Sequence, residues 1–445
     1  RPDLSQFDST LVADPIDHLA AALPIKAKTS QGYWIRVWIP EDAISGNYSS
    51  DVLIKNNHEV IGKLKLTVQV QQRTLPQPDQ WAFHLDLWQN PFAVARYHQV
   101  PLWSEEHFRI LKTELQPYTE AGGKVITVPI MHHPWGGQTY DPYETMITWV
   151  RKIDGSWWFD YTIFDKWVEF MMDMGVKKEI GCYSMIPWKL SFLYFDQATN
   201  SMKELKSKPG EQAYHDLWLS MLKDFATHLK SKGWFDITHI AMDERPMPDM
   251  LKALKIIREA DPDFKVSLAG SLHKELSDEL NDYCIAIAEK FSEEMKAKRK
   301  AEGKITTYYT CCAESHPNTY TFSNPAEGAW IAWYAAKENL DGYLRWALNS
   351  WTIEPLLDSR FYTWGAGDTY LLYPGGRTCL RFENLVAGIQ AYEKIRILKT
   401  ELQTQNKTAT LRKLERVLES FDELQLLKTP ANVVVEKANL FINGL

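Results

Sequence analysis

From residue 81 onward, short apolar runs alternate with longer amphipathic stretches through most of the chain. The apolar runs have the length of buried strands, and the stretches between them carry apolar residues at helical spacing. Eight strands separated by helices are typical of a (β/α)8 barrel, and we predict this α/β fold. An open doubly wound sheet is the competing architecture, but no glycine-rich phosphate loop follows the first strand. The candidate strands are residues 81–88, 124–131, 179–186, 238–243, 265–270, 282–287, 304–311 and 342–350.

The segments before and after this alternation have different residue patterns. Residues 33–40 alternate between apolar and polar, and further β-rich runs follow, so we predict a small β-sandwich-like domain over residues 1–76. The predicted catalytic barrel then occupies residues 77–403. Residues 404–445 are predicted to be a helical extension that packs on the barrel and carries no chemistry.

Two insertions interrupt the predicted barrel. Residues 148–162 and 190–207 have the pattern of hairpins and follow the second and third strands. Functional loops of a (β/α)8 barrel gather at the C-terminal ends of its strands, so both hairpins are expected to wall a substrate cleft. A long loop rich in aromatic residues and glycine, residues 358–376, follows the eighth strand.

The composition of the chain limits the kinds of molecule that we expect it to bind. The formal net charge is −7 with no dominant basic stretch, which argues against a nucleic-acid partner. No apolar run approaches the roughly 20 residues of a membrane span. The chain holds 18 Trp, 20 Tyr and 18 Phe, many of them beside polar residues at predicted strand ends. Aromatic faces stack on the apolar face of a sugar ring while neighbouring polar groups bind its hydroxyls, so this mixture favours a carbohydrate site.

Metal and cofactor chemistry has little support in the sequence. The five cysteines have no CxxC spacing, and neighbouring His132 and His133 point to opposite sides of a strand, so the two histidines rarely share an ion. There is no HExxH helix and no Gly-x-Ser-x-Gly elbow, which disfavours zinc and serine hydrolases. We therefore expect no metal and no other cofactor.

The segment THIAMDERP, residues 238–246, is the strongest candidate for chemistry. Its apolar run ends in Asp243 and Glu244, and Pro246 prevents the strand from continuing. Acids at the end of a buried strand are held rigidly where a substrate can meet them. The competing interpretation is a solvated helix N-terminus, where acidic residues favour the dipole.

Other residues at predicted strand ends complete a polar and aromatic rim. Counting in steps of two places Asn349 and Trp351 on the inner face of the eighth strand, and Leu344 and Trp346 on the face toward the helices. The predicted substrate-binding residues of this rim are Trp88, His132, Tyr183, Tyr309, Glu314, Asn349, Trp351 and Asp368.

Glycoside cleavage requires an acid for the leaving oxygen and a second group that stabilises an oxocarbenium-like centre. Glu244 is the predicted acid. The second group is either Glu314, acting as a nucleophile from across the barrel, or Asp243, which would orient a 2-acetamido group of the substrate. In the second case the amide oxygen attacks the anomeric carbon and an oxazolinium ion forms. A carbohydrate-binding protein without activity remains a third possibility, because fold does not imply function.

Three segments together resemble the catalytic module of family 123 of the glycoside hydrolases: residues 242–246 (MDERP), 342–351 (GYLRWALNSW) and 364–374 (WGAGDTYLLYP). The resemblance covers roughly residues 80–400 and implies a β-N-acetylgalactosaminidase with substrate-assisted, retaining chemistry and no metal. It assigns the amide-orienting role to Asp243 and the acid/base role to Glu244. The implied partner is a glycan or glycoconjugate ending in an N-acetylhexosamine. From the resemblance and an N-terminus, Arg1, that lacks methionine, we expect a secreted, periplasmic or cell-surface protein.

Overall fold

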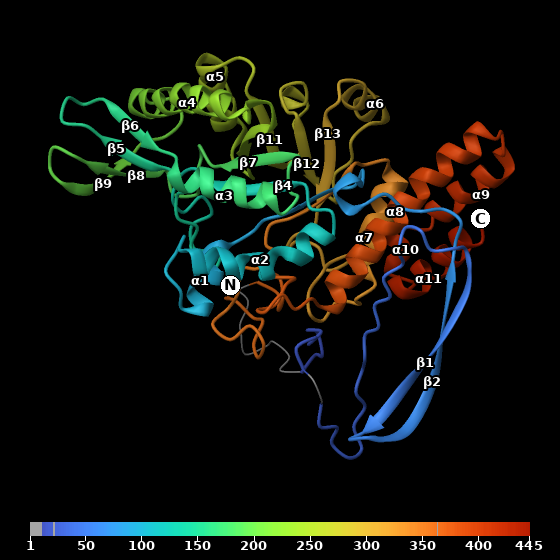
Figure 1. Cartoon of the computed structure of the whole chain (residues 1–445). Coiled ribbons are helices and arrows are strands. Elements are labelled where there is room, and N and C mark those ends of the chain that lie inside the picture. The colour runs from blue at the N-terminus through green and yellow to red at the C-terminus, as the bar shows by residue number, and fades with distance from the viewer. Residues whose placement is uncertain (1–10, 21–22, 363) are drawn as a thin grey trace. The chain divides into compact units, whose positions relative to one another are not determined.

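The computed structural model describes residues 11–20, 23–362 and 364–445 (Figure 1). The chain divides into two compact units, one formed by Arg1–Asp17 with Pro78–Leu445 and the other by His18–Gln77. In the second unit, β1 (Gly46–Asn56) pairs antiparallel with β2 (Glu59–Val70). The predicted N-terminal β structure is thus present as a two-stranded sheet. The prediction of a strand at 33–40 is wrong, because the large side chains of this segment are exposed and no sheet in the described part of the unit covers them.

The larger unit is built on eight parallel strands, which confirms the predicted barrel (Figure 1). Their order around the barrel is β3-β14-β13-β12-β11-β10-β7-β4. The ring is nearly closed between β3 and β4, where the backbone N–H of Lys124 donates to the carbonyl of Leu85 at 2.9 Å. The strands are β3 (His84–Leu87), β4 (Val125–Pro129), β7 (Glu179–Tyr183), β10 (Thr238–Met242), β11 (Lys265–Gly270), β12 (Asp282–Ala286), β13 (Ile305–Tyr309) and β14 (Gly342–Arg345).

Helices connect the strands, and further helices follow the last strand. Among the described residues, none of these helices has the length and apolarity needed to cross a membrane. The connecting helices are α1 (Pro91–His98), α2 (Glu105–Glu120), α3 (Thr162–Asp173), α4 (Gln212–Lys232), α5 (Met247–Ala260), α6 (Glu293–Ala301) and α7 (Glu327–Glu338), with short 3-10 turns η2 (Pro78–Gln80), η3 (Phe235–Ile237) and η4 (Lys274–Leu276). The last helices are α8 (Leu380–Thr404), α9 (Thr408–Leu418), α10 (Glu423–Leu426) and α11 (Ala431–Asn443).

The long helix α8 lies directly against α7, and two glycines make this close approach possible. A Cβ atom on Gly328 would lie 2.5 Å from the carbonyl oxygen of Arg381, and one on Gly388 would lie 2.6 Å from that of Ala329. Real Cβ atoms essentially never come so near, so both positions require glycine. This contact ties the C-terminal helices to the outside of the barrel.

Both predicted hairpins are present, and together they form one sheet. The first consists of β5 (Thr148–Arg151) and β6 (Trp157–Asp160), and the second of β8 (Ser191–Asp196) and β9 (Ser201–Lys206). They join because β5 pairs parallel with β8, which gives the order β6-β5-β8-β9. Insertions from two different barrel loops therefore build a single four-stranded sheet.

Candidate active site

A cavity of about 240 Å³ lies at the C-terminal ends of the barrel strands. Trp88 follows β3, the two acids of the MDERP segment follow β10, Tyr309 ends β13, and Trp346 follows β14. Most of the exposed lining is apolar, as in many small-ligand sites. The lining residues are Trp88, Trp135, Gln138, Trp188, Asp243, Glu244, Ala269, Tyr309, Thr310, Cys311, Cys312, Leu344, Trp346, Trp364 and Asp368.

Asp243 is a buried carboxylate with a donor on each oxygen. The indole Nε1 of Trp188 donates to its Oδ2 at 2.9 Å, and Nε of Arg245 donates to its Oδ1 at 3.0 Å. The Arg245 guanidinium also lies 4.6 Å from the centre of the Trp188 ring, so the three side chains support one another. Burial raises the pKa of Asp243, and the Arg245 charge and the Trp188 bond oppose this rise. The result is a well-oriented and comparatively basic carboxylate at the cavity wall.

Glu244 is the neighbouring acid, and its side chain is exposed to the cavity. The hydroxyl of Tyr309 donates to Oε1 of Glu244. Burial and the Glu244 carboxylate raise the pKa of Tyr309 above its ordinary value, so Tyr309 keeps its proton and remains a donor. Because only one oxygen is held, the other is available for proton exchange with a bound molecule. The adjacent Tyr308 is buried and donates to the carbonyl of Ile331.

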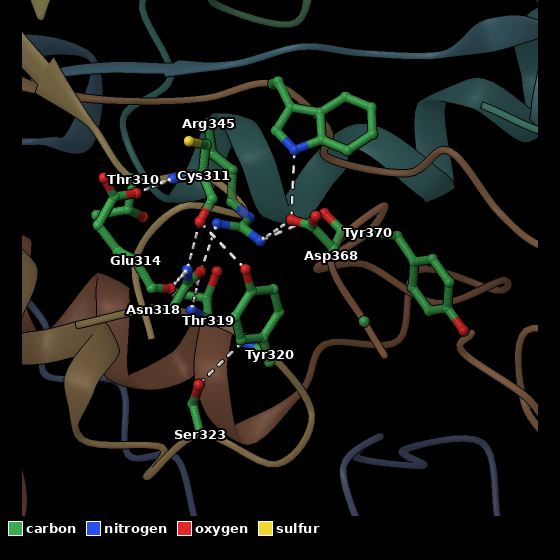
Figure 2. A network of polar contacts seen from close by, with 12 residues as sticks. Thr310, Cys311, Glu314, Asn318, Thr319, Tyr320, Ser323, Arg345, Asp368 and Tyr370 are labelled. Atoms are coloured by element: carbon green, nitrogen blue, oxygen red, sulfur yellow. Dashed lines mark hydrogen bonds and ion pairs between the residues drawn. The ribbon is translucent and has the colours of Figure 1, made fainter. Parts of the chain in front are cut away.

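Asp368 reaches the cavity from the long loop after β14. Its Oδ1 accepts from Nη2 of Arg345 at 2.5 Å and from the indole of Trp346 at 3.3 Å, as part of the network in Figure 2. Oδ2 has no hydrogen-bond partner among the described residues, although the side chain is buried. Burial raises the pKa of Asp368, and the Arg345 charge opposes this rise. This oxygen is therefore able to accept a further hydrogen bond.

Tryptophans form the walls of the cavity. Trp88 and Trp135 stack with ring centroids 4.5 Å apart and planes 23° apart, and Tyr183 lies 4.7 Å from Trp88. Trp364 is fixed by a bond from its indole to the carbonyl of Gln138 at 3.0 Å. Flat rings next to carboxylates suit a ligand with apolar faces and hydroxyl edges.

The structure places five of the predicted rim residues outside the cavity lining. His132 accepts from the backbone of Leu193 and thus supports the hairpin sheet. Tyr183 packs behind Trp88 and Trp135 instead of reaching the cavity. The other three are Glu314, Asn349 and Trp351.

Asn349 and Trp351 are structural in this fold. Asn349 exchanges two hydrogen bonds with the backbone of Asn90, and the Trp351 indole donates to the carbonyl of Leu372 at 2.7 Å. The prediction that both side chains lie on the inner face of the eighth strand is wrong. Counting in steps of two holds only along an extended strand, and β14 ends at Arg345. Leu344 and Trp346, which the counting turned toward the helices, line the cavity.

Glu314 is held inside its own loop. Its Oε2 accepts from the backbone N–H of Cys311 at 2.8 Å, and its carbonyl accepts from the amide of Asn318 at 2.7 Å (Figure 2). Asn318 also accepts from Arg345, so the loop is tied to the Arg345–Asp368 pair. Glu314 thereby orders the chain next to the cavity without lining it.

Sequence reasoning omitted several lining residues from the predicted site. Trp135 and Trp188 stand in the strand-end aromatic clusters, so that signal was sufficient to find them. Trp346 was assigned to the wrong face. Cys312 and Trp364 lie in loops, where periodicity gives no information.

Comparisons with known proteins agree with this geometry. The family model described as glycoside hydrolase 123, catalytic domain, matches residues 88–398, and the glycoside hydrolase 123 N-terminal domain matches residues 1–56. Among solved structures, a family 123 glycoside hydrolase from Clostridium perfringens, described by its hydrolysis of glycolipid glycans, is 28% identical with a TM-score of 0.82 and covers 91% of this chain and 77% of its own. A β-galactosidase from Rahnella sp. R3 is 10% identical with a TM-score of 0.40 over 73% of this chain and 58% of its own, which is too slight a likeness to bear on function. No curated protein matches the chain.

Proposed function

The chain belongs to family 123 of the glycoside hydrolases, and we propose that it releases terminal β-linked N-acetylgalactosamine with the substrate's own acetamido group as nucleophile. One observation carries this proposal. Asp243 and Glu244 stand side by side at the cavity, the first buried and fixed by two donors, the second exposed with one oxygen held. Neighbouring residues cannot flank a glycosidic bond from opposite sides, so the pair fits a division into amide orientation and acid/base catalysis.

In the first step, Asp243 accepts a hydrogen bond from the acetamido N–H and turns the amide oxygen toward the anomeric carbon. That oxygen forms a bond to the carbon while the glycosidic C–O bond breaks and Glu244 gives its proton to the leaving oxygen. The amide nitrogen gains positive charge as the oxazolinium ion forms. Its bond to the Asp243 carboxylate strengthens accordingly, which favours the transition state over the bound substrate.

In the second step, Glu244 takes a proton from a water molecule that attacks the anomeric carbon. The ring carbon–oxygen bond of the oxazolinium breaks, the acetamido group is restored, and the configuration is retained. Asp243 releases the strengthened hydrogen bond as the charge on nitrogen disappears. No covalent bond to the protein forms at any point.

The rival two-carboxylate route has less support than amide participation. It needs Glu314 at the cavity, but Glu314 is bound to the backbone of its own loop and does not line the cavity. The remaining lining carboxylate, Asp368, is bound to the buried Arg345 guanidinium. This pairing suits a role in binding a sugar hydroxyl through the free Oδ2.

The cavity size supports cleavage at a chain end. Its volume of about 240 Å³ lies just below the roughly 300–1,000 Å³ of sites for drug-sized ligands, so it suits one sugar unit. The relative from Clostridium perfringens is described by its hydrolysis of glycolipid glycans. We take glycolipid or other glycoconjugate glycans as the substrate class of this chain too, and a secreted, periplasmic or cell-surface location as the matching setting.

The test is hydrolysis of aryl N-acetyl-β-galactosaminide beside aryl β-galactoside, which lacks the acetamido group. We expect rapid release from the first and little from the second, with the β-anomer as the first product by NMR. A thiazoline mimic of the cyclic intermediate should bind far more tightly than N-acetylgalactosamine, as transition-state-like ligands do. Comparable rates on both aryl substrates, or weak thiazoline binding, would contradict amide participation.

The loss of activity at low pH, the acid limb of the pH profile, should reflect the protonation of Asp243. Activity requires the ionised carboxylate, so activity falls as the pH drops through the pKa of Asp243, which burial has raised. Arg245 opposes that rise, so Arg245→Gln should raise the pKa further and move the acid limb of kcat/KM to higher pH. The measurement is the pH dependence of kcat/KM for the wild type and for Arg245→Gln. Arg258→Gln on α5 is the control, and we expect its acid limb to match that of the wild type. An unmoved acid limb in Arg245→Gln would exclude Asp243 as the titrating group.

The cavity also contains an exposed thiol. Cys311 and Cys312 both line it, Cys312 is exposed, and a hydrogen bond from the Cys311 thiol lowers the pKa of Cys312 to about 7. Iodoacetamide should therefore alkylate Cys312 and abolish most of the hydrolysis, because the added group occupies the sugar site.

This inactivation should accelerate as the pH rises through about 7 and should be slowed by bound thiazoline. Each variant is compared with its own unmodified activity. Cys312→Ser should resist the reagent, whereas Cys182→Ser, which changes a buried thiol, should remain sensitive. Equal inactivation of Cys312→Ser would show that another residue reacts.

A further inference from the structure

The barrel interior holds a cluster of ionisable side chains at the end opposite the cavity. His84, Glu179 and Asp282 are the first residues of β3, β7 and β12, so they lie at the N-terminal ends of the strands. Their relative exposures are 4%, 2% and 6%. The three strands are not neighbours in the sheet order, so the side chains can meet only across the inside of the barrel.

The contacts within this cluster are close but are not hydrogen bonds. Nε2 of His84 lies 3.1 Å from Oδ2 of Asp282 and 3.9 Å from Oε2 of Glu179. Among the described residues, neither Nε2 of His84 nor Oε2 of Glu179 has a hydrogen-bond partner of acceptable geometry. Buried polar atoms are rarely left in this condition unless a water or an ion completes them.

The spacing fits a metal ion between the side chains. One ligand atom from each of the three residues lies within 4.8 Å of the other two. Zinc binds His nitrogen and carboxylate oxygen at about 2.0–2.2 Å, so two ligand atoms on one ion lie about 3–4 Å apart. The two distances from His84 fall in that range.

The surroundings favour a positive charge at this point. The carboxyl groups of Asp282 and Glu179 both lie within 4 Å of Nε2 of His84. His239 lies beside the cluster, with Nδ1 3.0 Å from Oε1 of Glu179, the carboxylate oxygen that the ion would not use. Such outer partners are usual for carboxylate ligands of metals.

We propose that His84, Glu179 and Asp282 hold one divalent metal ion, best matched by zinc, that stabilises the barrel. Zinc accepts both imidazole nitrogen and carboxylate oxygen as ligands, and in a four-coordinate site these three residues leave a fourth position. Asp86 lies on the same face of β3 as His84, and its Oδ1 has no hydrogen-bond partner among the described residues. It is therefore the candidate for that position. The ion takes no part in the sugar chemistry, which occurs at the other end of the barrel.

The rival explanation is that protons alone neutralise the cluster. To separate the two, the full chain is unfolded in guanidinium with a chelator and refolded with or without zinc, and bound metal is measured by mass spectrometry. We expect one zinc per chain after refolding with zinc, and a Tm several degrees lower without it, because a ligand bound only to the native state stabilises it. X-ray absorption should show nitrogen and oxygen ligands and no sulfur.

Variants place the ion in the cluster. His84→Asn should lose the zinc, whereas His107→Asn, which changes another buried histidine outside the cluster, should keep it. If His84→Asn does not fold, the wild-type measurement still decides. Wild type refolded with zinc that contains no stoichiometric metal, or has the same Tm in both preparations, would overturn the proposal.

Discussion

Replacement of Glu244 with glutamine is expected to lower kcat by about 10²–10⁴-fold on a natural glycan, the usual contribution of a general acid or base. Glutamine keeps the shape of the side chain and can still accept the bond from Tyr309, but it has no proton to give to the leaving oxygen. The loss should be much smaller on an aryl substrate whose leaving group needs no proton. Steady-state kinetics on the two substrate types measure this difference.

The matched control is Glu314→Gln, which changes the same residue type in a loop beside the cavity. We expect its kcat to remain within about tenfold of wild type, since Glu314 does not line the cavity and a positioning role costs less than a chemical one. A loss in Glu314→Gln equal to that in Glu244→Gln would revive the two-carboxylate route.

Replacement of Asp243 with asparagine is expected to cost about 10²–10³-fold in kcat on acetamido substrates, comparable with the loss of one hydrogen bond to a developing charge. Asparagine cannot offer a negative acceptor, so the positive charge on the amide nitrogen is no longer stabilised. The affinity for the thiazoline mimic should fall in parallel, because that ligand carries the same ring. Calorimetry and inhibition kinetics measure both effects.

Asp249→Asn on α5 serves as the control for Asp243→Asn, because it removes a charge a few residues away that pairs with Lys252. Its kinetics should match those of wild type. An Asp243→Asn enzyme that keeps its thiazoline affinity would separate this residue from the amide and assign it to another part of the substrate.

The barrel could be predicted from the sequence because the same pattern, an apolar run followed by a helical stretch, repeats along the chain. Eight apolar runs separated by helical stretches leave few alternatives, and strand ends then identify the active face. Asp243 and Glu244 were found in this way, since they directly follow the buried β10. The tryptophan content indicated the kind of ligand that the walls accept.

Other parts of the site depend on pairings that leave no local pattern. Arg345 and Asp368 are 23 residues apart and form a buried ion pair, which fixes the loop that brings Asp368 to the cavity. Glu314 looks like a catalytic acid by position, yet a backbone bond to Cys311 keeps it in its loop. Such contacts follow from the packed loops and not from periodicity.

A contact of the N-terminal segment likewise has no local pattern in the sequence. Asp14 lies in the same compact unit as the barrel and is buried against Arg381 of α8, with oxygen and nitrogen 2.7 Å apart. The two residues are separated by 367 positions, so neither composition nor spacing connects them. A linear division of the chain places them in different domains.

The sheet shared by the two hairpins has a consequence for how this enzyme can change. Because β5 and β8 pair with each other in the middle of the sheet, removal of either hairpin takes away this pairing and leaves an open strand edge on the other hairpin. Open edges invite pairing with other molecules and aggregation. The two inserts thus depend on each other, and we expect a variant that lacks one hairpin to tolerate the loss better when the other is removed as well.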